Sequence, residues 1–185
     1  MNCTSLAGIA GMLALVPLLL TTSATGAPGG AGDVHQLLAE HSAHVLATPS
    51  LSLDGAQTVL GASLAKAHEL STTGAIAVVD RGGHLLAFAR IDGTFQGSPD
   101  ISVGKARTAT LFNKATAAFE QIIKDGRTPM LAIDGFTPLQ GGVPVTIDGV
   151  IVGAVGVSGA ASAAQDEELA MAGANVFTTE PKSKD

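Results

Sequence analysis

The chain has 185 residues, enough for one domain with its own core, and a formal net charge of −6 with ten scattered Lys and Arg. Its hydrophobic fraction is 46%, but aromatic residues supply only 3%, and Trp and Tyr are absent. These values argue against a nucleic-acid partner, because the chain lacks both a basic surface for phosphates and the rings on which bases stack.

The first residues are typical of an exported protein. Leu6 to Leu20 form an unbroken apolar run of fifteen residues, shorter than the roughly 20 that a membrane span requires. Small residues at 25–27 then offer a cleavage site, so we expect residues 1–27 to be a signal peptide of a secreted or periplasmic protein. No Lys or Arg precedes the run, which leaves an uncleaved anchor as the alternative. Cleavage would also remove Cys3, the only cysteine, and with it any thiol chemistry.

Residues 28–50 read as a Gly- and Ala-rich linker followed by a helix over Asp33–Ala47, which Pro49 ends. His41 and His44 are three residues apart in this helix, a spacing that lets two imidazoles share a metal ion. No third ligand is evident nearby, so a solvated polar face is the favoured interpretation. No metal ligands are assigned.

Three further elements follow in chain order. Residues 51–74 predict a helix with Leu53, Leu60 and Leu64 on one apolar stripe and Gly74 beyond its end. The runs 75–80 and 84–92 are β-rich, and the tight Arg-Gly-Gly turn between them predicts a hairpin.

The second half predicts a long helix, a hairpin and a last helix. Helical spacing extends from Ser98 to a stop at Gly126. An irregular stretch leads to β-rich runs at 143–147 and 150–159, joined by Asp148-Gly149, the strongest short-range hairpin signal. Ser162 begins the last helix, and Gln165 completes a capping box. The order predicts an α/β (α+β) domain, with helices covering both faces of a mainly antiparallel sheet.

The glycine-rich stretch 141–169 fits no nucleotide or nucleophile motif. A P-loop requires a Lys that is missing between Lys124 and Lys182, and the glycine spacing fits neither a dinucleotide fingerprint nor a nucleophile elbow. Gly153 and Gly156 instead indicate close approach of another backbone, or of a helix or subunit that lies on the sheet, and Gly159 marks the strand exit. The acidic residues 166–168 either stabilise the helix dipole or reach an iron or another ligand.

Several of these stretches together resemble the GlcG/HbpS family, also called the haem-degrading domain family. The motifs are AIAVVDRGGHLLAFARIDG, SVGKARTAT, PLQGGVPV, DGVIVGAVGVSGA and QDEELAMAG, in the family's order and spacing between Leu51 and Phe177. The resemblance implies a domain over 51–177 with a profilin-like three-layer α/β/α sandwich, commonly assembled as homo-oligomers. Residues 178–185 would be a flexible tail.

The resemblance also implies a function. We expect an exported protein that binds haem or a related tetrapyrrole, in haem and iron handling or redox sensing, and that is more a binding protein than an enzyme. The alternatives are a haem-degrading enzyme and an accessory protein of glycolate or hydroxy-acid oxidation. A sensor kinase or an oxidase is a possible partner. No catalytic residue is assigned.

Three residues are candidates for the haem site. His68 at the edge of the first helix's stripe could ligate iron, although a His at a helix end also suits the dipole. Lys105 and Arg107 could bind the two propionates; alternatively they pair with Asp80, Asp92 or Asp100. His84 is more consistent with an exposed turn residue.

Overall fold

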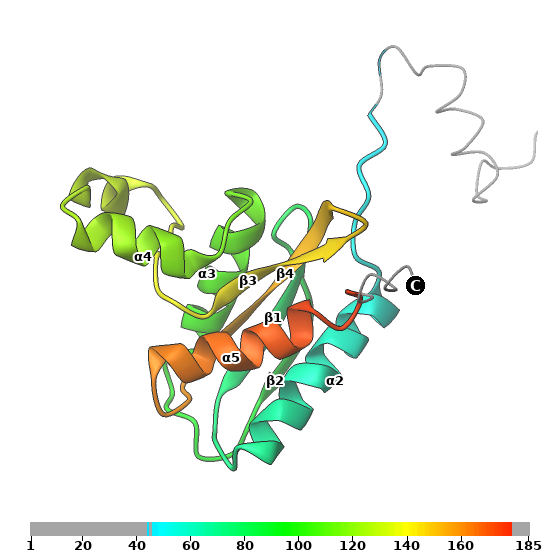
Figure 1. Cartoon of the computed structure of the whole chain (residues 1–185), viewed down its shortest axis with the longest axis vertical. Coiled ribbons are helices and arrows are strands. Elements are labelled where there is room, and N and C mark those ends of the chain that lie inside the picture. The colour runs from blue at the N-terminus through cyan, green and yellow to red at the C-terminus, as the bar shows by residue number, and fades with distance from the viewer. Residues whose placement is uncertain (1–43, 45, 179–185) are drawn as a thin grey trace, which may run out of the picture. The chain divides into compact units, whose positions relative to one another are not determined.

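The computed structural model of the chain describes His44 and residues 46–178 (Figure 1). The chain divides into two units, residues 1–47 and 48–185, and the elements below belong to the second unit. The signal peptide, nearly all of the helix expected over Asp33–Ala47, and the tail beyond Thr178 lie outside the described residues. Those three expectations stay predictions.

The described part of the second unit contains helices on both sides of four strands. In chain order the elements are α2 (Leu53–Glu69), β1 (Ala75–Asp80), β2 (Leu85–Arg90), α3 (Ser98–Leu111), α4 (Thr116–Lys124), the 3-10 helix η1 (Thr128–Ala132), β3 (Gly142–Ile147), β4 (Val150–Ser158) and α5 (Ala163–Ala174). No helix in this part of the chain combines the length and the apolar character that a membrane span requires.

The four strands form one sheet in the order β2-β1-β4-β3, and every neighbouring pair is antiparallel. Both predicted hairpins are present. In the β3–β4 turn, Asp148 and Gly149 have φ values of 49° and 80°, the two positive angles that a type I′ turn requires. The Asp-Gly signal therefore predicted the correct connection.

Helices cover both faces of the sheet (Figure 1). α2 and α5 lie side by side on one face, while α3 lies on the other, over β1, β4 and β3. Ile76, Val78, Val155 and Val157 belong to the core under α2 and α5. A second core under α3 contains Val79, Ala106, Ala109 and Ala154. The predicted three-layer sandwich with an antiparallel sheet is confirmed, and two covered faces explain why β1 and β4 do not alternate.

Glycine allows α3 to lie directly on β4. A Cβ atom at Gly156 would overlap with the carbonyl oxygen of Ser102 and lie 2.5 Å from the backbone nitrogen of Ala106. A Cβ atom at Gly153 would likewise overlap with the backbone carbonyl oxygen of Val79 in β1. Gly159 leaves β4 with a φ of 101°, as its role at the strand exit requires. The close approach predicted for these glycines is therefore confirmed.

The predicted apolar stripe of α2 is wrong at one position. Leu53 is 54% exposed, whereas the buried face carries the smaller residues Ala56, Val59, Ser63 and Ala67. Leu53 is the first residue of α2, whereas Leu60 and Leu64, further along the helix, are partly buried and pack against the core. The end of α2 also differs from the prediction, because Ser71, at a φ of 50°, takes the left-handed position in place of Gly74.

The predicted single helix over 98–126 is two helices. α3 ends at Leu111 and α4 begins at Thr116, and Asn113 between them has a φ of 54°. Asn tolerates the left-handed conformation and can end a helix as Gly does. The break turns α4 away from α3, and the rings of Phe112, Phe119 and Phe136 pack edge to face, with centroids 5.0–5.7 Å apart.

The start of α5 is a modified capping box. The Ser162 hydroxyl accepts a hydrogen bond from the backbone nitrogen of Gln165, as predicted. The Gln165 side chain, however, accepts from the backbone nitrogen of Ala161 and from the Thr72 hydroxyl instead of returning to Ser162. The cap thus also ties α5 to the segment that follows α2.

Candidate functional site

A buried ion pair joins α3 to α5 at the end of β4. Lys105 Nζ donates to Asp166 Oδ2 and to the Val157 carbonyl oxygen, each at 2.8 Å. The other carboxylate oxygen of Asp166 accepts from the backbone nitrogen of Ala160 at 2.9 Å. Lys105 is only 3% exposed and Asp166 only 6%. The alternative partners expected for Lys105, which were Asp80, Asp92 and Asp100, are therefore wrong.

Two glycines at the start of β3 make room for this pair. At Gly141, with a φ of 116°, a Cβ atom would lie 2.8 Å from the Asp166 Cβ and 3.1 Å from Lys105 Nζ. At Gly142 it would lie 2.5 Å from the Lys105 carbonyl oxygen. The Gly142 backbone nitrogen donates to the Thr116 hydroxyl at 2.8 Å, which ties α4 to the same point. The glycines of PLQGG thus permit the chain to pass beside the buried lysine.

The ion pair lies in the wall of a cavity of about 300 Å³, called the Lys105 cavity below. α4 and the segment before β3 supply Glu120, Leu139 and Gln140, whereas Lys105 and Asp166 come from α3 and α5. Glu120 accepts from Lys124 Nζ and from the Gln140 backbone nitrogen, both at 2.6 Å. The ammonium of Lys124 and that backbone N–H hold the pKa of Glu120 below its ordinary value. The Gln140 side chain donates to Glu167.

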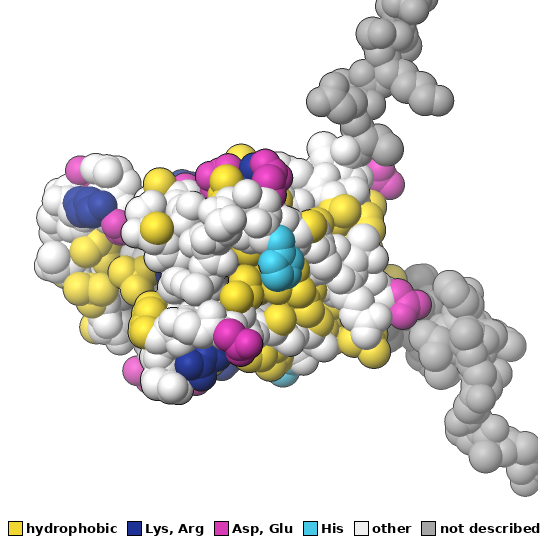
Figure 2. All heavy atoms as spheres, turned by 90° about the horizontal axis from the view of Figure 1, so that it is seen from below, with side chains coloured by type: hydrophobic (Ala, Val, Ile, Leu, Met, Phe, Trp, Pro, Cys, Tyr) yellow, Lys and Arg dark blue, Asp and Glu magenta, His cyan; other side chains and the backbone are white. Residues whose placement is uncertain are grey.

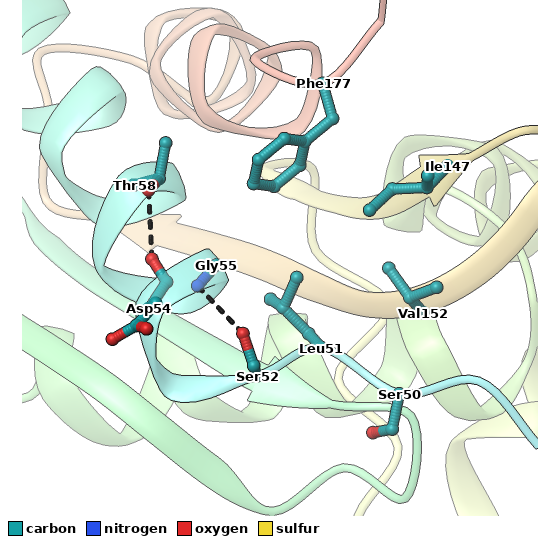
Figure 3. Close-up of a pocket in the computed structure, with 9 residues that line it drawn as sticks. All are labelled: Ser50, Leu51, Ser52, Asp54, Gly55, Thr58, Ile147, Val152 and Phe177. Atoms are coloured by element: carbon teal, nitrogen blue, oxygen red, sulfur yellow. Dashed lines mark hydrogen bonds between the residues drawn. The ribbon is translucent and has the colours of Figure 1, made fainter.

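A second, more apolar cavity of about 440 Å³ lies beside the first turn of α2 (Figure 3). The side chains of Leu51, Ile147, Val152 and Phe177 face it, and Asp54 is its one charged residue. The Ser52 hydroxyl accepts from the Gly55 nitrogen as the α2 N-cap. The Thr58 hydroxyl donates to the Asp54 carbonyl oxygen, and the Ser50 hydroxyl accepts from the backbone nitrogen of Arg81, so the hydroxyl groups that line this cavity have partners within the protein.

The structure does not bring the three predicted site residues together. His68 is exposed at the end of α2, on one side of the sheet, while Lys105 and Arg107 belong to α3 on the other. Arg107 is itself exposed, because residues two apart point to opposite sides of a helix. His84 is an exposed turn residue, as expected, and contacts Asp80 at 3.3 Å. His44 is also exposed, and His41 lies outside the described residues.

Sequence reasoning missed most of the Lys105 cavity. It noted Asp166 only as a helix-start acid or a possible ligand contact, and it did not single out Glu120 or Gln140. The pair members are 61 residues apart, so no local spacing signals their contact. Over the described residues, no group of three or more His, Cys, Asp or Glu side chains could hold a metal ion.

Fold and site together define a class of protein. The protein is a three-layer α/β/α sandwich whose middle layer is an antiparallel sheet. A small cavity with charged residues in its wall lies where α3 and α4 meet α5. It has none of the strand-to-helix phosphate loops of nucleotide enzymes in its described residues. Residues 51–175 match the family described as "Haem degrading protein HbpS-like", and the chain belongs to that family.

Relatives support this assignment. Protein GlcG of Escherichia coli K12 is 43% identical over 108 residues, which cover 58% of this chain and 81% of GlcG. The crystal structure of HbpS is 33% identical with a TM-score of 0.69, over 74% of this chain and 96% of HbpS. The Klebsiella pneumoniae protein ORFY is 30% identical with a TM-score of 0.68, over 75% of this chain and 97% of ORFY.

Proposed function

We propose that this protein binds haem or a related tetrapyrrole, with a role in haem and iron handling or redox sensing. The observation that carries the proposal is the family match over residues 51–175, which includes every helix and strand described from α2 to α5. The likeness to HbpS extends over almost the whole of that protein.

The described cavities do not fit haem. Iron in haem proteins is held by His, Cys, Met or Tyr, and none of these residues lines the two cavities described above. Tyr is absent from the chain. The described imidazoles at 44, 68 and 84 are all exposed, so a haem that uses one of them would bind at the surface. Figure 2 shows one face of the molecule, on which a histidine side chain lies beside hydrophobic side chains.

His68 is the iron ligand that we propose. It lies in the last turn of α2, four residues after Leu64, which is partly buried and packs against the core. Arg107 is exposed and could meet a propionate of a haem bound elsewhere or by a second copy, whereas Lys105 is already engaged with Asp166. Arg107 is therefore a better candidate than the buried Lys105 for binding a haem propionate.

We expect His68→Ala to lower hemin affinity at least about tenfold, the loss that changes around a metal ligand produce. The shift and saturation of the Soret band in a hemin titration measure this. His84→Ala is the matched control, because it removes another exposed imidazole and should leave the titration unchanged. Equal titrations for the wild type and both variants would rule out His68 as the ligand.

Haem degradation is the second candidate, favoured by the description of the family itself. The same hemin titration distinguishes binding from degradation when a reductant such as ascorbate is added. A degrading enzyme would bleach the Soret band and release iron faster than hemin without protein does. A binding protein would keep the band.

We also infer that the working form is a homo-oligomer. Many large apolar side chains are exposed, among them Phe88 on the edge strand β2, Phe112 beside α4, and Leu131 and Ile133 on the segment after α4. Where exposed apolar side chains gather into one patch, another protein commonly covers them. A second copy of the chain is the simplest partner.

We propose that the protein is exported and that residues 1–27 are removed. The mature chain should then begin at Pro28 and lack Cys3, so intact mass and a thiol titration would show the shortened chain with no reactive thiol. Leu15→Arg should block the process, because it places a charge in the apolar run. A wild-type chain that keeps its first residues and reacts with one equivalent of thiol reagent would refute cleavage.

A further inference from the structure

The Lys105 cavity combines buried charge with a small volume. Lys105 and Asp166, both more than nine-tenths buried, form part of its wall together with the partly buried Glu120. Its volume of about 300 Å³ lies at the lower end of the range for small-molecule sites. A flat tetrapyrrole is too large for it, so an occupant would be a smaller molecule and independent of haem.

The polar groups in its wall keep unused hydrogen-bonding capacity. A lysine ammonium has three N–H donors, and among the described residues Lys105 uses two, for Asp166 and the Val157 carbonyl oxygen. Each carboxylate oxygen can accept two hydrogen bonds. The two oxygens of Asp166 accept one each, from Lys105 and from Ala160, and those of Glu120 accept one each, from Lys124 and Gln140.

The wall therefore contains a positively charged donor, Lys105, and two negatively charged acceptors, Asp166 and Glu120. An anionic ligand would meet the carboxylates of Asp166 and Glu120, and a cationic ligand would meet the ammonium of Lys105. A hydroxyl group donates and accepts at once and carries no charge. Phe95, Ile101 and Leu139 add an apolar side to the same cavity, which suits the carbon skeleton of such a molecule.

We propose that the Lys105 cavity is a binding site for a small neutral molecule with neighbouring hydroxyl groups, of the polyol class. One hydroxyl accepts from Lys105 Nζ, and the same or the next hydroxyl donates to Asp166 or Glu120. α4 and the Leu139–Gln140 segment form one wall and α3 with α5 the other, so the bound molecule also links these two parts of the chain.

Three probes of similar size separate the possibilities: glycerol, acetate and ethylammonium. In two-dimensional amide NMR spectra of the purified protein, millimolar glycerol should produce saturable shifts at Gly159, Ala160 and the Gln140 side chain. Acetate and ethylammonium at equal concentration and ionic strength should not. Saturable shifts at these positions with either ion, or none with glycerol, would overturn the proposal.

A variant that partly fills the cavity tests whether glycerol binds there. Ala163 lines the cavity and Ala164 does not, yet both are exposed residues in the first turn of α5. Ala163→Leu should weaken glycerol binding at least about tenfold, while Ala164→Leu should leave it unchanged. Equal effects of the two variants would place the glycerol elsewhere. The experiment contains no haem, so its outcome is independent of the haem titration.

Discussion

Gly156→Ala is expected to lower the free energy of unfolding by about 3 kcal/mol or more, because β4 and α3 leave no space for a methyl group. The new Cβ would overlap with the Ser102 carbonyl oxygen and lie 2.5 Å from the Ala106 nitrogen. These are backbone atoms of α3, which cannot rotate aside as a side chain could. The helix would have to lift from the sheet and open the core around Ala109 and Ala154. Urea unfolding of both proteins measures the difference.

Gly61→Ala is the matched control for this prediction. Gly61 is exposed within α2, and apart from its chain neighbours and the backbone of its own helix no atom lies within 4 Å of the position where its Cβ would be. The same substitution should there raise stability by about 0.5–1 kcal/mol, because alanine loses less backbone entropy in a helix than glycine does. If Gly156→Ala costs less than about 1 kcal/mol, the close contact of α3 with β4 is not present in solution.

The parts of the fold that sequence predicted correctly are those with local causes. Asp148-Gly149 specifies its turn through two positive φ angles, and the β-rich runs on either side then pair as a hairpin. Ser162 likewise caps the helix that follows it. Prediction failed where the chain departs from the apolar spacing: Asn113 ended a helix that this spacing would continue, and Leu53 is exposed as the first residue of α2.

The candidate site was less predictable because its contacts are not local. Lys105 and Asp166 belong to helices in different layers, and they meet only where β4 ends and the glycines at 141 and 142 make room. The motif GKARTAT drew attention to Lys105 and Arg107 as a pair, but helical geometry sends these side chains to opposite sides. From sequence alone, the aspartates nearer in the chain were the natural partners to expect.

Lys105→Met should destabilise the protein by about 3–5 kcal/mol, since it leaves the Asp166 carboxylate buried without its countercharge. Methionine has a similar length and fills the space, so the change tests charge and hydrogen bonding more than packing. Lys124→Met is the matched control: its partner is Glu120, but Lys124 is 63% exposed, and such pairs contribute at most about 1 kcal/mol. Urea unfolding of the two variants gives the comparison.

The double variant Lys105→Met/Asp166→Asn separates the cost of a lone charge from the value of the pair. Asparagine keeps an oxygen that can accept from the Ala160 nitrogen, and it removes the uncompensated negative charge. Replacing both members of a buried pair is often far less costly than removing one. We therefore expect the double variant to regain at least about half of the stability that Lys105→Met loses. If it is no more stable than that single variant, the lysine contributes through its bond to the Val157 carbonyl and its packing, and the ion pair is not what joins α3 to α5.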